Sequence, residues 1–375
     1  MNKKLLSTLF IGLVFQSKLS AQTLNLTTVS ALPTNFKEGS GLIYTSTGKL
    51  LTHNDSGGKN EIAIMDTLGN LLKTIVVDSA TNVDWEDITN DVNGNYYIGD
   101  FGNNLNDRTD LKIYKIPNPE LATNDTVVEQ TISFTFSNQT AFPPANAELN
   151  FDCEAVVWKN DSLFVFTKNR TVPFNGYTYM YSMPATPGNY IAQLTDSFYC
   201  GPGPKENYWI TAAAFNATRD KLVLLSSAQI WLFQNFSGTD YFGGNVSNLQ
   251  LSGFTQKEGI TFDNGLQLYI CDEQTFGFFG NIYKTDLNTI LANVEPSINE
   301  LSNINFYVDG DYLVVQNLPN YFATISLVNA IGETVISKEN CEEYCSFALN
   351  SFAKGCYILK ISDLNQQRSF KILIK

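Results

Sequence analysis

Four glutamates stand at the start of four similar stretches of this chain. They are Glu38, Glu86, Glu154 and Glu258. Each is followed by a short apolar run, a turn, and a second apolar run. In three of the stretches the second run ends 14 residues after the glutamate, at Asp100, Lys168 and Asp272. Because the interval is the same in these copies, we expect the glutamates to lie at equivalent positions of a repeated unit.

These glutamates would form a ring if the repeated units were arranged around one axis. Carboxylates that converge on an axis repel each other unless they are protonated, hydrated or bound to a cation. Ca²⁺ takes about six to eight oxygen ligands, which carboxylates, amides, carbonyls and water provide. The pattern therefore predicts a Ca²⁺ site formed by Glu38, Glu86, Glu154 and Glu258. The alternative is that each glutamate accepts backbone N–H bonds from the neighbouring unit and holds the ring together.

Polar side chains also gather where the second apolar runs end and in the loops that follow. They are Asn54, Asp55, Asp100, Asn103, Asn104, Lys168, Arg170, Asp272 and Glu273. Acids, amides and bases within one set of loops are typical of a ligand-binding site. Asn and Asp are also favoured in turns for backbone reasons alone, which is the alternative explanation.

His53 is the only histidine of the chain. A zinc site built from several histidines is therefore excluded, and a Ser-His-Asp triad would have to use this residue. Its position beside Asn54 and Asp55 makes it a weak candidate for a general base, the alternative being a polar residue at a strand end. The chain has neither a Gly-x-Ser-x-Gly motif nor a phosphate-binding loop.

The repeated stretches are predicted to be β-hairpins, because turns such as Asn93-Gly94 join their apolar runs. A weaker copy begins near Thr211, so that consecutive copies start 48, 68, 57 and 47 residues apart. Further strand-like runs give each copy about four strands, which is the size of a propeller blade. We therefore predict an all-β chain with a five-bladed β-propeller, or a six-bladed one if residues 123–150 contain another blade.

An alternating strand at residues 23–32 has no hairpin partner of its own, and the copy that begins at Glu258 lacks a clear outer strand. We expect the N-terminal strand to complete this last blade, because that pairing closes the ring and covers its open edges. The propeller is then predicted to occupy residues 22–296.

Residues 1–21 have the pattern of a secretory signal peptide, with Lys3 and Lys4, an apolar run over 5–15, and Ser20-Ala21 at the predicted cleavage site. The run is too short to span a bilayer, and no later run is long enough. We therefore expect a mature chain outside the cytoplasm without a membrane span. Removal of residues 1–21 would change the net charge of the chain from −13 to −16. Such acidity argues against nucleic acid as a partner.

The six cysteines include no Cys-x-x-Cys pair. Three lie in the predicted propeller, at positions 153, 200 and 271, and three near the C-terminus, at positions 341, 345 and 356. Export permits disulfides, so we expect at most one in each part. The sequence leaves the pairing open.

Residues 300–375 contain further strand-like runs separated by Gly and Asn turns, which predicts a small β-sandwich. Three segments, at 332–335, 352–358 and 371–375, resemble the type A C-terminal sorting domain of the Bacteroidetes type IX secretion system. The Pro-Asn-Pro that often opens such domains is missing. The resemblance implies that residues 300–375 engage the type IX machinery and that the protein is secreted or held at the outer cell surface. The alternative is a carbohydrate-binding sandwich.

The motifs NDSGG at 54–58, DWEDI at 84–88 and GDFGNN at 99–104 make the first part similar to a group of secreted bacterial propellers. This group is largely uncharacterised and resembles SdiA-regulated and phytase-like or esterase-like propellers, and the resemblance implies a fold rather than a reaction. Two functions stay open. The first is an exported propeller that binds an unknown ligand or partner at an acid-lined mouth, with a divalent cation and no turnover. The second is a calcium-dependent hydrolase of phosphoesters or lactones, in which an acid or His53 activates water.

Overall fold

The computed structural model describes residues 22–274, 280–288, 304–329, 333–362 and 367–374. The chain divides into two compact units, with the division after residue 290. The signal-peptide segment 1–21 and the predicted boundary at 296–300 lie outside the described residues. Short 3-10 helices connect some strands: η1 (Thr34–Phe36), η2 (Pro119–Leu121), η3 (Thr123–Asp125), η4 (Asn146–Glu148) and η5 (Lys205–Asn207). Among the described residues, no helix has the length and apolar character needed to cross a membrane.

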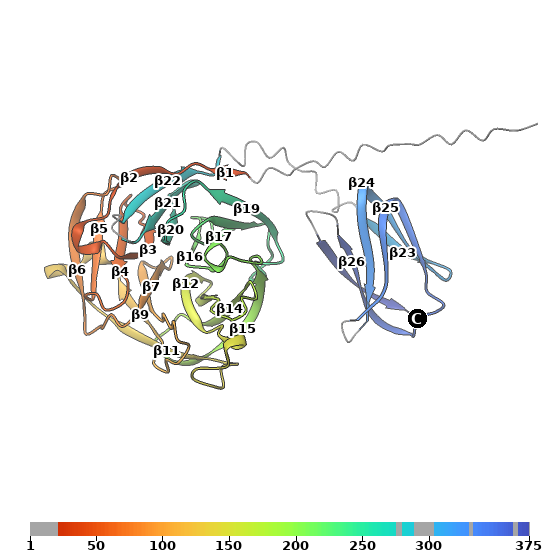
Figure 1. Cartoon of the computed structure of the whole chain (residues 1–375), viewed down its shortest axis with the longest axis horizontal. Coiled ribbons are helices and arrows are strands. Elements are labelled where there is room, and N and C mark those ends of the chain that lie inside the picture. The colour runs from red at the N-terminus through yellow and green to blue at the C-terminus, as the bar shows by residue number, and fades with distance from the viewer. Residues whose placement is uncertain (1–21, 275–279, 289–303, 330–332, 363–366, 375) are drawn as a thin grey trace, which may run out of the picture. The chain divides into compact units, whose positions relative to one another are not determined.

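The first unit is a five-bladed β-propeller, in which the four strands of each blade lie side by side in order from the axis to the rim (Figure 1). Blade 1 consists of β3 (Gly39–Tyr44), β4 (Leu50–Asn54), β5 (Glu61–Met65) and β6 (Leu71–Asp78). Blade 2 consists of β7 (Trp85–Asn90), β8 (Asn95–Asp100), β9 (Lys112–Pro117) and β11 (Gln130–Phe136). Blade 3 consists of β12 (Asp152–Lys159), β13 (Ser162–Lys168), β14 (Tyr177–Pro184) and β15 (Gly188–Tyr199).

Blade 4 consists of β16 (Ala212–Phe215), β17 (Lys221–Leu225), β18 (Gln229–Gln234) and β19 (Asn245–Leu251). Blade 5 consists of β20 (Lys257–Phe262), β21 (Gln267–Asp272), β22 (Asn281–Asp286) and the N-terminal β2 (Thr27–Ala31). Residues 123–150 provide β10 (Thr126–Val128) and β11 and add no further blade. The five-bladed prediction is therefore confirmed.

The ring closes through the N-terminal strand, as the sequence predicted. β2 pairs antiparallel with β22, and Thr28 lies opposite Tyr283. The preceding β1 (Thr23–Leu24) is a separate short strand that pairs in parallel with β19 of blade 4. One N-terminal segment therefore holds two neighbouring blades together.

Parallel pairs at the rim cover the outer edges of the other blades. β10 pairs with β6 of blade 1, and β11 of blade 2 pairs with β15 of blade 3. Because an uncovered edge is a template for aggregation, these additions protect the molecule while they join adjacent blades.

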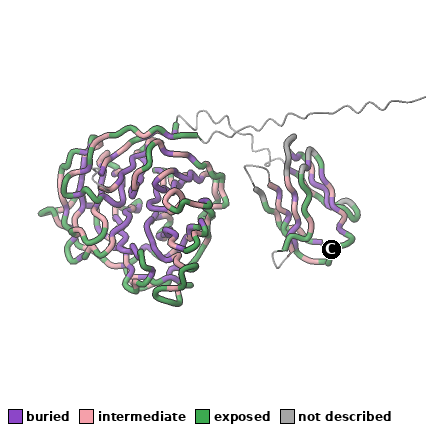
Figure 2. The backbone as a smooth tube through the Cα atoms, in the orientation of Figure 1, coloured by how far each residue is buried: buried purple, intermediate pink, exposed green. Residues whose placement is uncertain are grey.

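The apolar core lies between the blades. Side chains alternate along a strand, so a buried strand can contact two neighbouring blades. In β13, Leu163 and Val165 pack between blades 2 and 3, whereas Phe164 and Phe166 pack between blades 3 and 4. Figure 2 shows buried backbone toward the centre of the ring and exposed backbone at its rim.

The second unit is the predicted small β-sandwich. It consists of β23 (Asn305–Asp309), β24 (Tyr312–Val328), β25 (Thr334–Ala348), β26 (Gly355–Ser362) and β27 (Gln367–Ile374). The long strand β24 pairs with β23 through its first half and with β26 through its second half. Register shifts in the β24–β25 pair mark where these strands bend. Residues such as Val315, Leu359 and Ile361 form its apolar core.

Candidate functional site

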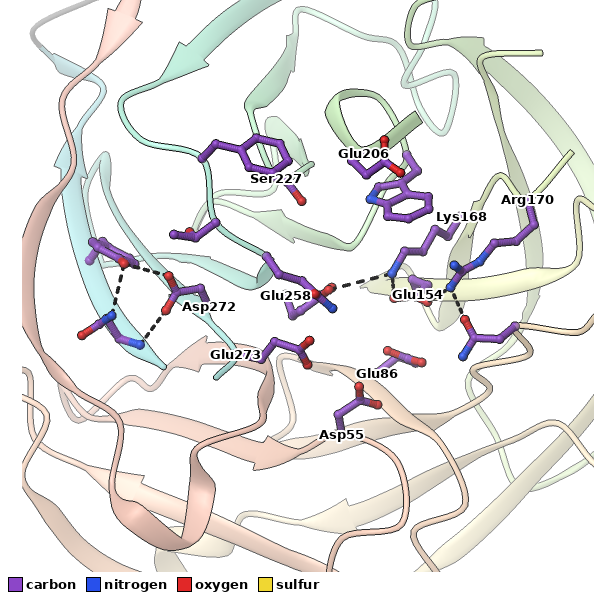
Figure 3. A pocket seen from close by; sticks show the side chains of 17 residues that line it. Asp55, Glu86, Glu154, Lys168, Arg170, Glu206, Ser227, Glu258, Asp272 and Glu273 are labelled. Atoms are coloured by element: carbon purple, nitrogen blue, oxygen red, sulfur yellow. Dashed lines mark hydrogen bonds and ion pairs between the residues drawn. The ribbon is translucent and has the colours of Figure 1, made fainter. Parts of the chain in front are cut away.

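A cavity of about 580 Å³ opens at one mouth of the propeller (Figure 3). It forms where the inner strands begin and the second strands end, because each antiparallel hairpin brings these two ends together. Asp152 lies opposite Lys168, for example, and Lys257 lies opposite Asp272. The lining residues are Asp55, Glu86, Asn104, Glu154, Lys168, Arg170, Glu206, Trp209, Ser227, Phe254, Thr255, Gln256, Glu258, Asp272, Glu273, Asn281 and Tyr283. Three of the four predicted metal residues and six of the nine predicted ligand residues therefore line the same cavity.

Irregular pairing turns three of the glutamates toward this cavity. The pairing of β12 with β13 skips Glu154, and that of β20 with β21 skips Glu258. Glu86 lies in a similar shift between β7 and β8. Bulges of this kind re-aim a side chain and are frequent beside functional sites. All three glutamates are buried and line the cavity.

The structure places Glu38 elsewhere, since this residue is exposed and does not line the cavity. The interval from Glu38 to Asn54 is 16 residues, two more than in the other three copies. The bulge of β3 falls later, at Gly41, whose φ of 66° favours glycine. In blade 4, Thr211 occupies the corresponding place, and its hydroxyl donates to the Lys257 carbonyl at 2.6 Å.

Lys168 supplies a positive charge to two of the glutamates. Its buried Nζ lies 3.0 Å from Glu154 Oε2 and 3.8 Å from Glu258 Oε1. Burial alone would lower the pKa of Lys168, but Glu154 and Glu258 outweigh burial and raise it. Burial raises the pKa of both glutamates, and Lys168 opposes this rise. The chain itself therefore offsets part of the repulsion for which the sequence predicted a metal ion.

Arg170 adds a second positive charge beside the cavity. Its Nε donates to Asp152 Oδ2 at 2.6 Å, and its Nη2 lies 3.4 Å from Glu154 Oε1. The same guanidinium donates to Asn104 and lies over the ring of Trp209 at 5.0 Å from the centroid. This side of the cavity is cationic and aromatic.

Three carboxylates lie close together beside the cavity, and two of them, Asp55 and Glu86, line it. One oxygen from each of Asp55, Asp84 and Glu86 lies within 4.8 Å of the other two. Burial, followed by Asp55 and Asp152, raises the pKa of Asp84 to about 7. Burial also raises the pKa of Asp55 and of Glu86, and for Glu86 the next cause is Glu154.

Gly102 closes this cluster from one side. A Cβ atom at this position would collide with the carboxylates of Asp84 and Glu86, so a larger residue would displace them. Lys168 lies within range to lower the pKa of Asp55 and Glu86, but its ion pairs are with Glu154 and Glu258. Arg108 acts in the same direction on the pKa of Asp84.

Of the nine predicted ligand residues, six line the cavity: Asp55, Asn104, Lys168, Arg170, Asp272 and Glu273. Asp272 accepts hydrogen bonds from Asn281 N at 2.6 Å and from the Tyr283 hydroxyl at 2.7 Å. Burial, followed by Glu258 and Asp55, raises the pKa of Glu273 to about 8.

The other three predicted ligand residues have structural contacts outside the cavity. Asp100 is fully buried and accepts a bond from Arg108 at 3.0 Å. Asn103 joins blades 2 and 3, since its backbone N–H donates to Asp152 at 2.7 Å. Asn54 donates to the carbonyl of Asn35 at 2.6 Å. These contacts are of the kind expected from turn-forming Asn and Asp.

His53 lies away from the cavity, at the contact between blades 1 and 2. It is fully buried, and its ring meets that of Trp85 edge-on at a centroid distance of 5.4 Å. Burial lowers its pKa to about 4. The imidazole is therefore neutral and has no access to a molecule in the cavity.

The sequence analysis did not identify Asp84 or the three aromatic residues of the cavity as parts of the site. Asp84 belongs to the DWEDI motif, and its position two residues before Glu86 was the available signal. Trp209 lines the cavity from the segment between blades 3 and 4, Phe254 from the loop between blades 4 and 5, and Tyr283 from blade 5. They have no shared spacing, because each comes from a different kind of segment.

Residues 302–375 match the family described as the secretion system C-terminal sorting domain. This confirms the type IX tail that the sequence indicated. A tail of this family directs export to the outer cell surface or secretion, so the protein is exported and carries its propeller outside the cell. No curated protein matches the chain closely enough to count as a relative.

Several solved structures resemble the chain at low identity. PorZ, a surface component of the type IX secretion system of Porphyromonas gingivalis, is 11% identical with a TM-score of 0.33, and the match covers 89% of this chain and 44% of PorZ. PQQ-bound aldose sugar dehydrogenase from Streptomyces coelicolor is 8% identical with a TM-score of 0.42, covering 69% of this chain and 97% of the enzyme. A putative gluconolactonase is 11% identical with a TM-score of 0.38, covering 67% and 74%. The chain spans less than half the length of PorZ, and these similarities assign no function.

Proposed function

We propose that this exported propeller binds a ligand at the acid-lined cavity and holds a divalent cation, Ca²⁺, between Asp55, Asp84 and Glu86. The proposal rests on the approach of these carboxylates to within 4.8 Å of one another, beside a cavity that Asp55 and Glu86 line. Ca²⁺ prefers oxygen ligands and tolerates irregular geometry, which suits three carboxylates completed by water and ligand oxygens. The proposed cation site therefore shares only Glu86 with the ring of four glutamates.

The residues on the cationic and aromatic side of the cavity indicate the chemistry of the ligand. Lys168 and Arg170 stand beside Trp209, with Nζ and Cζ at 4.9 and 5.0 Å from the ring centroid. Such a wall suits a polar ligand that has an anionic or oxygen-rich group and a face that packs on an aromatic ring. Ligand oxygens would complete the coordination of the cation on the opposite side.

A second function, hydrolysis of phosphoesters or lactones, is favoured by Glu273. Its pKa of about 8 is close to neutrality, the range in which a carboxylate serves best as a general base. A bound Ca²⁺ would supply Lewis-acid polarisation of a substrate oxygen. In this alternative Glu273 accepts a proton from water, and His53 has no part.

The test is thermal unfolding of the full chain with CaCl₂ or with EDTA. At a hundredfold excess over the dissociation constant, Ca²⁺ should stabilise the wild type by about 2.7 kcal/mol. Glu86→Gln and Asp55→Asn should lose this response, whereas Glu38→Gln should keep it because Glu38 lies outside the cluster. Loss of the response in Glu38→Gln and Glu86→Gln, with a normal response in Asp55→Asn, would favour the four-glutamate ring instead. An unchanged melting temperature for the wild type in both solutions would remove the cation from the proposal.

Turnover distinguishes the two functions. A panel of phosphoesters and lactones is assayed with the wild type and with Glu273→Gln in the presence of CaCl₂. Hydrolysis that disappears in the variant would establish the enzyme. A cation response without hydrolysis by either protein would support the binding function.

A further inference from the structure

Two thiols meet in the core of the sorting domain. Cys341 and Cys345 both lie on β25, and both are buried among apolar residues such as Leu313, Leu318 and Phe347. Their Sγ atoms are 2.9 Å apart. The third cysteine of this unit, Cys356, lies on β26 and is exposed.

This contact requires an irregular strand. In a regular strand, residues four apart are separated by about 13 Å. Here the pairing of β25 with β24 is shifted on both sides of Leu318: Cys345 lies opposite Val315, whereas Cys341 lies opposite Ala323. The shifts accompany a bend in β25 that brings the two sulfur atoms together.

We propose that Cys341 and Cys345 form a disulfide bond in the exported protein. The two thiols lose two protons and two electrons as the Sγ–Sγ bond forms. The electrons reduce a disulfide of a thiol–disulfide exchange protein or of a small-molecule disulfide such as oxidised glutathione, which becomes two thiols. The export route that the sorting domain specifies passes through compartments where such oxidants act.

A disulfide at this place would stabilise the C-terminal unit. A sandwich of this size has a small core, and small exported domains commonly depend on cross-links. The bend in β25 interrupts the regular pairing that would otherwise hold β24 and β25 together. A bond between Cys341 and Cys345 would fix the bend from within.

The reaction is expected before the unit has folded. Burial, followed by the neighbouring Cys345, raises the pKa of Cys341 to about 12 in the folded unit, so little thiolate is present there. Thiol–disulfide exchange requires a thiolate that the oxidant can reach. The unfolded chain should therefore react with oxidised glutathione much faster than the folded, reduced protein.

Peptide mapping tests the proposal directly on the full chain. Cleavage after Lys338 and Lys354 releases residues 339–354, which contain Cys341 and Cys345 and no other cysteine. Protein refolded with oxidised glutathione is unfolded in urea so that every free thiol is accessible, treated with iodoacetamide and digested with trypsin. This peptide should be unalkylated and lighter than its reduced form by two hydrogen atoms, while Cys356 should be alkylated. Alkylation of both cysteines, or a bond from either to Cys356, would overturn the proposal.

Variants separate the bond from a general effect of oxidation. In Cys341→Ser the remaining Cys345 should become alkylated, and Cys356→Ser should leave the bond unchanged. Dithiothreitol should lower the melting temperature of the sorting-domain transition in the wild type and in Cys356→Ser. It should have no effect in the double variant Cys341→Ser/Cys345→Ser. Equal melting of the oxidised and reduced wild type would show that no stabilising bond forms at this position.

Discussion

Asp87 Oδ2 accepts a hydrogen bond from the backbone N–H of Val156 at 2.9 Å, 69 residues further along the chain. The same oxygen lies 3.3 Å from Ala213 N, and Oδ1 accepts from Ile88 N at 2.8 Å. One fully buried carboxylate in blade 2 thus connects the inner strands of blades 3 and 4. The sequence analysis did not identify this role, because Glu86 was the only acid of the DWEDI motif that it singled out.

Replacement of Asp87 by alanine should destabilise the propeller by about 3 kcal/mol or more, because it leaves buried N–H groups of Val156 and Ala213 without an acceptor. The free energy of unfolding is measured by urea denaturation. Asp240→Ala is the control, since exposed Asp240 accepts a local bond from Gly243 N. A similar loss in both variants would contradict the connecting role of Asp87.

Replacement of Lys168 by methionine should destabilise the protein by about 3 to 5 kcal/mol at pH 8, because the buried carboxylates of Glu154 and Glu258 lose their ion pairs with Nζ. The loss should be smaller at pH 5, because burial raises the pKa of both acids and so favours their neutral forms as the pH falls. Lys59→Met removes an ion pair of an exposed lysine and should change stability by less than about 1 kcal/mol. Urea denaturation at both pH values measures the difference. A loss that does not depend on pH would indicate that only packing was disturbed.

The stability of the calcium-free protein should fall as the pH rises from about 4 to 8. Folding raises the pKa of Asp84 from 3.8 to about 7 and that of Glu273 from 4.5 to about 8, so both acids favour the folded state in their protonated forms. Their contribution is complete below the unfolded values and is lost as the pH passes the folded ones. Stabilisation by CaCl₂ should change in the opposite direction, because the cation binds the ionised carboxylates.

Melting temperatures at pH 5.5 and pH 8, with CaCl₂ or EDTA, test this dependence. Asp84→Asn should flatten the dependence in EDTA without abolishing it, since Glu273 remains, and should lose the calcium response. Asp240→Asn should behave as the wild type. If calcium stabilised the wild type equally at both pH values, Asp84 would not be a ligand.

Deletion of residues 371–375 should stop export and leave the protein in the periplasm of a host that has a type IX system. These residues include the whole second half of β27, which pairs with β26 within the sorting domain. The location is measured by cell fractionation and immunoblotting. Melting of the propeller should be unchanged, because the propeller is a separate compact unit. Normal appearance of the truncated protein outside the cell would contradict the prediction.

The fold could be predicted from the sequence because short stretches of residues indicate its strands, its turns and its repeated blades. The hairpin turns, the blade-sized spacing and the unpaired N-terminal strand each followed from a short stretch of residues. The site could be predicted only in part. The interval of 14 residues identified Glu86, Glu154 and Glu258. The interval after Glu38 is longer, which indicates that the ring of four glutamates is not regular. The position of Trp209 and the ion pair between Lys168 and Glu258 depend on how separate blades are placed against each other. No local sequence pattern predicts this placement.

The closure of the ring by β2 also determines when the propeller can fold. Thr28 and Tyr283 are more than 250 positions apart, so blade 5 is incomplete until nearly the whole propeller segment has been synthesised. Contacts between such distant residues slow folding, because a long loop must close before they form. Until then β22 lacks its outer neighbour β2. The N-terminal residues of the propeller are therefore among the last to find their place in the folded unit.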